Sequence, residues 1–253
     1  MDVKGIIVTI FILILLYVIV KLIYSTATAP LSPMQNGMTM TTVMPTSLQG
    51  GTSGANSGNF SYSIWFYIND WNYRYGEPKV IFGRMGSATT SGGGSVSGVS
   101  GNDPCPAVVL GGVQNNLSIS MSCYPGANSQ RESTSTNSVV HTCNVANVPV
   151  QRWVNLLVSV YGRSLDVYID GKLVKTCLLP GVAKINTKSP IYVTPGGGFS
   201  GWTANFQYWS NPTDPQTAWN IYSQGYGSPF NLSQLKLKVA VYQGSTETGS
   251  LTI

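Results

Sequence analysis

The sequence predicts an all-β protein, an antiparallel sandwich behind one N-terminal transmembrane helix, with one short helix towards its C-terminal side. Three observations predict this. Hydrophobic residues make up 43% of the 253 residues and charged residues only 9%, against about 25% charged in an average soluble protein. Short runs of alternating apolar and polar residues recur after residue 60, separated by turn residues. Residues 5–24 instead form one long apolar run.

The apolar run reads GIIVTIFILILLYVIVKLIY and contains one charge, Lys21. A helix of this length spans about 30 Å, the thickness of the bilayer core. A cleaved signal peptide is the alternative, since residues 27–29 (Ala-Thr-Ala) resemble a cleavage site; however, Pro30 would follow the cut, and the run exceeds the ~7–15 apolar residues typical of signal peptides. We therefore expect an uncleaved anchor over residues 1–25, with the lipid bilayer as the partner of residues 5–24. The flanking lysines leave its orientation open.

Residues 26–58 are rich in Ser, Thr, Gly, Met and Pro and show no apolar periodicity. This composition is typical of an extended linker. The alternative is that its methionines pack on a neighbouring surface; they are Met34, Met38, Met40 and Met44.

The predicted domain covers residues 59–227 and consists of short strands. Gly112–Asn116 and Gly162–Arg163 separate two pairs of strands and predict two hairpins. Residues 87–101 are a Ser/Gly-rich stretch and predict an exposed loop. The expected strands are 62–68, 79–84, 107–111, 117–122, 152–161, 164–170 and 172–178.

One helix is expected, over residues 214–224. Asp214 can cap its N-terminus, Pro215 occupies the first helical position, and Gly225 can end it. The tail, residues 228–253, contains the alternating run 235–243, which could add an edge strand to this domain or to a neighbour.

Three stretches resemble laminin-G-like, concanavalin A-like jelly rolls. NFSYSIWFYI (59–68) is similar to the opening strand, WVNLLVSVYGRSLDVYIDGKLV (153–174) to the central hairpin, and FSGWTANFQYWSNPTDPQTAWNIYSQG (199–225) to the closing segment. The resemblance implies the jelly-roll fold. It says little about function, because this fold occurs in lectins, glycosidases and structural modules.

The polar residues do not suggest catalysis. Asp166 and Asp170 share a strand face, but four residues of strand separate them by roughly 13 Å, beyond the ~5–9.5 Å between glycosidase carboxylates. The single histidine, His141, excludes a site that needs two imidazoles. No dense acidic cluster suggests a metal, and no Lys/Arg run suggests nucleic acid. We expect no catalytic residues, metal or cofactor, and no enzyme activity.

Four cysteines allow three full pairings. Cys105 and Cys123 bracket the hairpin 107–122, which is the placement expected for a cross-strand disulfide. Cys143 and Cys177 would then pair with each other or remain thiols.

Aromatic residues give the remaining argument for binding. Trp71, Tyr73 and Tyr75 stand in the expected loop NDWNYRYGEP, where exposed rings could contact a glycan or a partner protein. Ordinary packing is the alternative. Trp202, Trp209 and Trp219 are expected in the sandwich core and in packing of the helix.

The combination of one membrane helix, this jelly roll and a charge-poor surface resembles minor capsid or virion membrane proteins of large DNA viruses. The leading hypothesis is a non-enzymatic, membrane-anchored structural module that links an internal membrane to a protein shell. Its partners would be other proteins of a large, capsid-like assembly, and its location the interface between virion membrane and capsid. The alternative is a membrane-anchored, lectin-like adhesion protein at a cell surface. A degenerate glycosidase is a weaker option.

Overall fold

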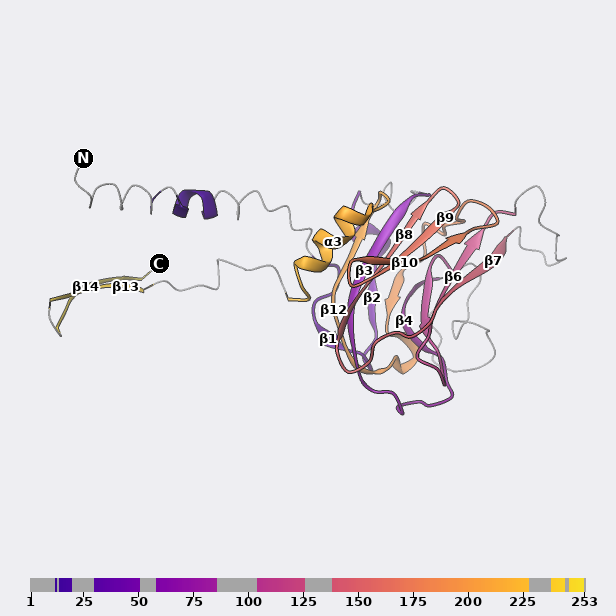
Figure 1. The fold of residues 1–253 in the computed structure, drawn as a ribbon, viewed down its shortest axis with the longest axis horizontal. Helices are drawn as coiled ribbons and strands as arrows, with labels where there is room; N and C mark the ends of the chain where they lie inside the picture. The colour runs from indigo at the N-terminus through magenta and orange to yellow at the C-terminus, as the bar shows by residue number, and fades with distance from the viewer. Residues whose placement is uncertain are drawn as a thin grey trace.

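The computed structural model describes residues 12, 14–19, 30–50, 58–85, 104–125, 138–227, 238–243 and 246–252. Two antiparallel six-stranded sheets lie face to face (Figure 1). The first sheet has the order β1 (Gln35–Asn36), β12 (Ser200–Trp209), β3 (Phe60–Asp70), β8 (Trp153–Tyr161), β9 (Ser164–Ile169) and β10 (Lys172–Leu178). The second has the order β2 (Thr41–Val43), β11 (Ile191–Val193), β4 (Lys79–Arg84), β5 (Ala107–Leu110), β6 (Leu117–Cys123) and β7 (Val139–Val145).

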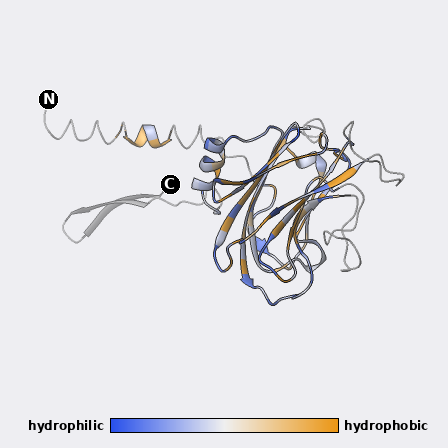
Figure 2. Cartoon of the chain, turned by 45° about the vertical axis from the view of Figure 1, so that its right-hand side comes forward, coloured by the Kyte–Doolittle hydropathy of each residue, from blue (hydrophilic) through white to orange (hydrophobic). Residues whose placement is uncertain are grey.

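The core lies between the two sheets, and β3 shows how the sequence builds it. Side chains alternate between the faces of a strand, so Tyr62, Ile64 and Phe66 all join the main hydrophobic cluster. The ring of Tyr62 lies 5.9 Å from that of Phe206 and 4.9 Å from that of Tyr208, both on β12. Figure 2 shows hydrophobic residues interspersed with polar ones along the strands of both sheets. The predicted β-sandwich is therefore confirmed.

The local signals for turns and for the helix are also confirmed. β5 pairs with β6, and β8 with β9, as the two predicted antiparallel hairpins. Helix α3 (Pro215–Ser223) has Asp214 as its N-cap, and an Asp214 carboxylate oxygen accepts a hydrogen bond from the Thr217 amide at 2.9 Å. Ala218 and Ile221 of α3 pack on Leu157 of the first sheet.

The expectation of an extended linker is wrong for residues 30–50. β1 pairs with β12, and β2 pairs with β11, so this stretch adds an edge strand to each sheet. A short 3-10 helix, η1 (Pro45–Ser47), follows β2. Val43 and Leu48 are buried in the main core. Met34 is half exposed at 51%. These strands are too short to produce a periodic pattern, and they gain their stability from pairing with longer strands.

The predicted Cys105–Cys123 disulfide is wrong, whereas the Cys143–Cys177 pairing that the sequence left open is present. Cys143 of β7 forms a disulfide with Cys177 of β10. Each of these strands is the edge strand of its sheet, and the disulfide joins the two edges. Cys105 and Cys123 are buried thiols. The register sets Ala107 opposite Ser120, so the two thiols do not face each other across the hairpin. The Cys105 sulfur lies 3.4 Å from the sulfur of Met121.

Most of the expected anchor and the loop 87–101 lie outside the described residues. Residues 12 and 14–19 are helical. Among the described residues, no helix is both long and apolar enough to cross a membrane. In the tail, β13 (Lys238–Gln243) pairs with β14 (Thr246–Thr252) in a separate two-stranded sheet, so it does not extend either sheet of the sandwich. A second 3-10 helix, η2 (Pro195–Gly197), lies between β11 and β12.

Candidate binding site

A hollow of about 630 Å³ lies where three loops meet at one end of the sandwich. The loops connect β3 to β4, β5 to β6, and β7 to β8. We call this feature the Trp71 hollow. It is lined by Trp71, Val113, Gln114, Asn115, Asn116, Ala146, Asn147 and Val150.

The β3–β4 loop carries Trp71 and turns because of local polar contacts. An Asp70 carboxylate oxygen accepts a hydrogen bond from the amide of Asn72 at 2.9 Å, which starts the turn as β3 ends. The amide of Gly76 then donates to the carbonyl of Gly112 at 3.0 Å. This contact joins the β3–β4 loop to the β5–β6 loop.

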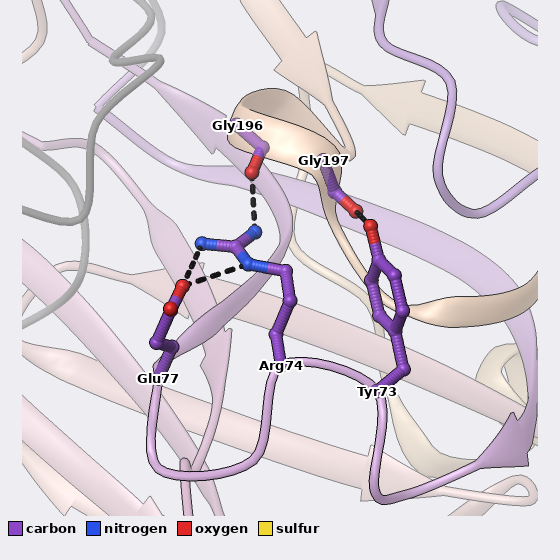
Figure 3. A network of polar contacts seen from close by, with 5 residues as sticks. All are labelled: Tyr73, Arg74, Glu77, Gly196 and Gly197. Carbon is purple, nitrogen blue, oxygen red and sulfur yellow. Dashed lines mark hydrogen bonds and ion pairs between the residues drawn. The ribbon is translucent and has the colours of Figure 1, made fainter.

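Figure 3 shows what holds the same loop against η2. The Tyr73 hydroxyl donates to the Gly197 carbonyl at 3.1 Å. The Arg74 guanidinium donates to the Gly196 carbonyl and pairs with the Glu77 carboxylate, with a shortest N–O distance of 2.7 Å. Trp71 is therefore presented by a loop with several anchoring contacts, which reduces the entropy lost on binding.

The other two loops of the Trp71 hollow are fixed in the same way. The Asn115 carbonyl accepts from the Val148 amide at 2.8 Å, and the Asn115 side chain donates to the Val148 carbonyl at 3.2 Å. The Gln151 amide donates to the Ile68 carbonyl at 2.9 Å. Asn147 has a φ of 58°, a left-handed conformation that Asn tolerates better than most residues. The side chains of Gln114 and Asn147 are exposed at the hollow.

A buried lysine lies against Trp71. Lys79, at the start of β4, is 1% exposed, and its Nζ is 4.7 Å from the centroid of the Trp71 ring. Among the described residues this Nζ has no hydrogen-bonding partner. Burial lowers the pKa of Lys79, nearby Arg74 lowers it further, and the carboxylates of Glu77 and Asp70 partly offset both effects.

The lining of the Trp71 hollow combines one aromatic face with side-chain amides, and it contains no carboxylate or imidazole. The two carboxylates considered from the sequence serve the strands instead. Asp170 pairs with Arg152 and accepts from the Asn155 amide at 3.0 Å. Asp166 accepts from the Thr176 hydroxyl at 2.6 Å. Within the described ranges, no group of three or more His, Cys, Asp or Glu side chains could hold a metal.

The three rings named from the sequence have three different surroundings. Trp71 lines the hollow and also packs on the main core. Tyr73 is tied to η2, while Tyr75 is 59% exposed and does not line the hollow. Of the three tryptophans expected in the core or in helix packing, Trp209 packs beside α3, whereas Trp202 and Trp219 are each 46% exposed. Sequence reasoning missed Gln114, Asn115, Asn116 and Asn147, because amides are common throughout this chain and no local pattern distinguishes these four.

No family model matches this chain, and no curated protein matches it. Among solved structures, the binding domain of botulinum neurotoxin DC in complex with rat synaptotagmin II aligns with a TM-score of 0.50 at 13% identity, over 79% of this chain and 46% of that chain. The same neurotoxin's binding domain in complex with SialylT aligns at 0.47 and 14% identity, over 74% and 43%. The serotype D binding domain aligns at 0.46 and 11%, over 72% and 42%.

This chain therefore spans less than half the length of each of those binding domains. At this level of identity, the first alignment establishes a shared β-sandwich fold and nothing about the ligand.

Proposed function

We propose that the protein is a non-enzymatic, membrane-anchored binding module that takes carbohydrate in the Trp71 hollow. The observation that carries this proposal is the set of groups around the hollow. One indole and the amide side chains of Gln114, Asn115, Asn116 and Asn147 surround a space of about 630 Å³.

These groups complement a neutral sugar. The C–H face of a sugar ring is apolar and packs on the face of an aromatic ring. Tyr and Trp supply such rings at many binding surfaces. Each side-chain amide both donates and accepts hydrogen bonds, which suits hydroxyl groups that do the same. The lining has no charged side chain, so a neutral glycan fits it better than a phosphate or an acidic peptide.

The fold supports the same proposal. The sequence resembles concanavalin A-like, laminin-G-like jelly rolls, and this resemblance favours carbohydrate binding because lectins occur in that fold. The solved structures with similar folds are described as binding domains. The anchor at residues 5–24 and a cell-surface location are also part of the proposal.

A glycan array probed with the full chain in detergent micelles tests the proposal. We expect binding to at least one neutral oligosaccharide. Trp71→Ala should weaken the affinity for it at least about tenfold, as loss of an aromatic contact in a binding site does. Gln114→Ala should weaken the affinity less. Tyr75→Ala is the matched control, since Tyr75 lies on the same loop, is exposed and does not line the hollow; its affinity should equal that of the wild type.

Binding that is lost equally in the Trp71 and Tyr75 variants would place the sugar elsewhere on the loop. An array on which the folded full chain binds nothing would contradict the carbohydrate proposal.

A second candidate function is the structural module of a capsid-like assembly, which links an internal membrane to a protein shell. Strand β10 favours it. It is an edge strand of the first sheet, and it carries three exposed apolar residues, Leu173, Val174 and Leu178. An exposed edge with apolar side chains is suited to pairing with a strand of another chain.

Detergent fractionation of the native source tests this second candidate. A chain held by protein contacts stays with a large sedimenting particle after lipid is removed. Leu173→Lys should then release it as a small species, and Lys175→Arg should not. Release of the wild type by detergent alone would contradict the structural role.

A further inference from the structure

A second surface on the same domain is lined by aromatic rings and one methionine, with no charged side chain among the lining residues. Met34, Tyr67, Trp153, Trp202 and Tyr226 line a hollow of about 360 Å³. We call these five residues the aromatic platform. Met34 is 51% exposed and Trp202 46%, and Tyr226 is exposed as well.

The platform is built by strand register. Asn36 pairs with Trp202, Trp202 with Tyr67, and Tyr67 with Trp153. These pairs form one row across β1, β12, β3 and β8. Adjacent β3 residues Phe66 and Ile68 point into the core, so the row faces away from it.

Ring contacts fix the platform. The centroid of Trp153 lies 5.8 Å from that of Tyr67, and 4.4 Å from that of Tyr226, with which it is stacked at 12°. Tyr226 follows α3, and its ring also contacts Trp65 edge-on at 5.8 Å. The rings of Tyr67, Trp153 and Tyr226 are thus held in place before any partner arrives.

The chemistry of the platform suits the boundary between lipid headgroups and acyl chains. Trp and Tyr are enriched at that depth, because each has a large apolar ring and one polar group. No charged side chain and no side-chain amide lines this hollow. A polar ligand would therefore find few hydrogen bonds there.

The chain connection also brings the platform near the membrane. The sequence predicts that residues 5–24 span a bilayer, and the Leu31 amide already donates a hydrogen bond to Phe206 of β12. Six residues, 25–30, lie between Tyr24 and Leu31, and they reach at most about 25 Å. Met34 lies three residues after Leu31 and immediately before the edge strand β1 of the first sheet.

We infer that the aromatic platform rests on the surface of the same bilayer that holds residues 5–24, with the rings of Trp202 and Tyr226 at the level of the headgroups. The lipid surface is the partner that both the ring chemistry and the short connection favour. The contact arises because the aromatic rings partition into the lipid interface, and not from charge attraction. It should therefore form on zwitterionic lipid and change little with salt concentration.

Tryptophan fluorescence tests this inference, because no tryptophan precedes residue 65. Any quenching by lipid therefore reports the sandwich and not the anchor. The full chain is reconstituted into phosphatidylcholine vesicles, with and without acyl chains brominated close to the headgroup. We expect brominated lipid to quench the wild type. Trp202→Phe should remove about half of the quenched intensity, since Trp153 is the platform's only other indole. Trp209→Phe, on the same strand, should remove little, because Trp209 packs beside α3.

Two variants that each add a tryptophan provide a control, because a misfolded protein could lose quenching but would not gain it at one chosen position. Met34 and Tyr161 are both exposed, and Tyr161 lies at the far end of β8 from Trp153. Met34→Trp should add quenched intensity, and Tyr161→Trp should add only unquenched intensity. Quenching that is absent in the wild type, or equal in the Met34 and Tyr161 variants, overturns the inference. If the platform instead contacts a second copy of the chain, quenching by lipid is also absent. In that case the sedimentation coefficient is larger than that of a monomer, and Trp202→Phe lowers it.

Discussion

The Trp71 hollow and the aromatic platform lie close together along the chain but are built differently. Tyr67 of the platform precedes Trp71 by only a few residues of β3 and its loop. The Trp71 hollow is made by loops and lined with amides. The platform is made by paired strands and lined with rings and one methionine.

The difference shows how one sandwich can serve two kinds of partner. Loops can place amides around a single ring because their backbone is not committed to sheet pairing. Strands present a row of side chains at fixed spacing, which suits a flat contact such as a lipid surface. Changes to the shared framework, to the strands and to the loops should therefore have separable effects.

The largest expected effect comes from the framework. Replacing Cys143 and Cys177 by Ser removes the link between the edges of the two sheets. With 34 residues of separation, the lost loop constraint should lower the free energy of unfolding by about 4 kcal/mol. Chemical denaturation of the full chain in micelles measures this. Thr142→Ser is the control on the same strand. Ligand affinity and lipid quenching should be unchanged while the variant remains folded.

Thiol titration checks the same bond in another way. The unreduced wild type should show two thiols after denaturation, from Cys105 and Cys123. Before denaturation these should react slowly, because both are buried and burial raises the pKa of Cys123 to about 11. Four thiols after denaturation would contradict the Cys143–Cys177 disulfide.

The next effect is specific to the platform. A Cβ at Gly201 would lie 1.8 Å from the Tyr67 carbonyl oxygen, and Gly201 has a φ of 154°. Gly201→Ala should therefore push β12 away from β3, at a cost of about 2–3 kcal/mol. Lipid quenching should fall, while carbohydrate affinity is retained. Gly58→Ala is the control, since nothing lies within 4 Å of its added methyl. Equal quenching in both variants would show that the row is not needed.

A smaller effect is expected at the Trp71 hollow. Lys79→Met removes a buried ammonium while keeping its volume, so stability at neutral pH should equal or exceed that of the wild type. Because burial lowers the pKa of Lys79, the folded protein holds fewer protons than the unfolded chain between the lowered value and the ordinary one. The free energy of unfolding of the wild type therefore increases as the pH rises through that window. The difference in this free energy between the wild type and Lys79→Met should become smaller. Denaturation at several pH values tests this, with exposed Lys172→Met as the control. A variant that loses stability would show that the contact between Nζ and Trp71 outweighs desolvation.

The smallest effect is at α3, which precedes Tyr226 of the platform. Hydrogen bonds from Thr217 lower the pKa of Asp214. The stabilisation by Asp214 is therefore present above the ordinary carboxylate pKa and is lost as the pH falls through the lowered value. Asp214→Ala should lower the melting temperature by about 2 °C at pH 7, and the difference should become smaller in acid, where the charge of Asp214 is lost. Asp214→Asn should keep the cap without the pH dependence. A difference that is as large in acid as at pH 7 would contradict this role of the carboxylate charge.

The parts predicted from sequence depend on local signals. The alternation in β3, the glycine turn at Gly162 and the cap at Asp214 all act within a few residues, and the structure has each of them. Strands β1 and β2 have two and three residues, so only their pairing with β12 and β11 defines them. Composition alone therefore predicts a linker in this stretch.

The disulfide and the binding site depend on tertiary structure. Cys143 and Cys177 meet because β7 and β10 lie at corresponding edges of the two sheets, which hairpin symmetry does not reveal. Trp71 can be predicted from the sequence as a binding residue because a large ring in an expected loop is unusual. The amides of Gln114 and Asn147 come from separate loops, and only the folded chain brings them to the same hollow.

Carbohydrate affinity of the full chain in phosphatidylcholine vesicles, compared between the wild type, Trp71→Ala and Trp202→Phe, tests the central claim most directly. The account predicts at least about a tenfold loss for Trp71→Ala and no change for Trp202→Phe. Equal losses in both variants, or no loss in Trp71→Ala, would contradict a carbohydrate site in the Trp71 hollow that is separate from the platform.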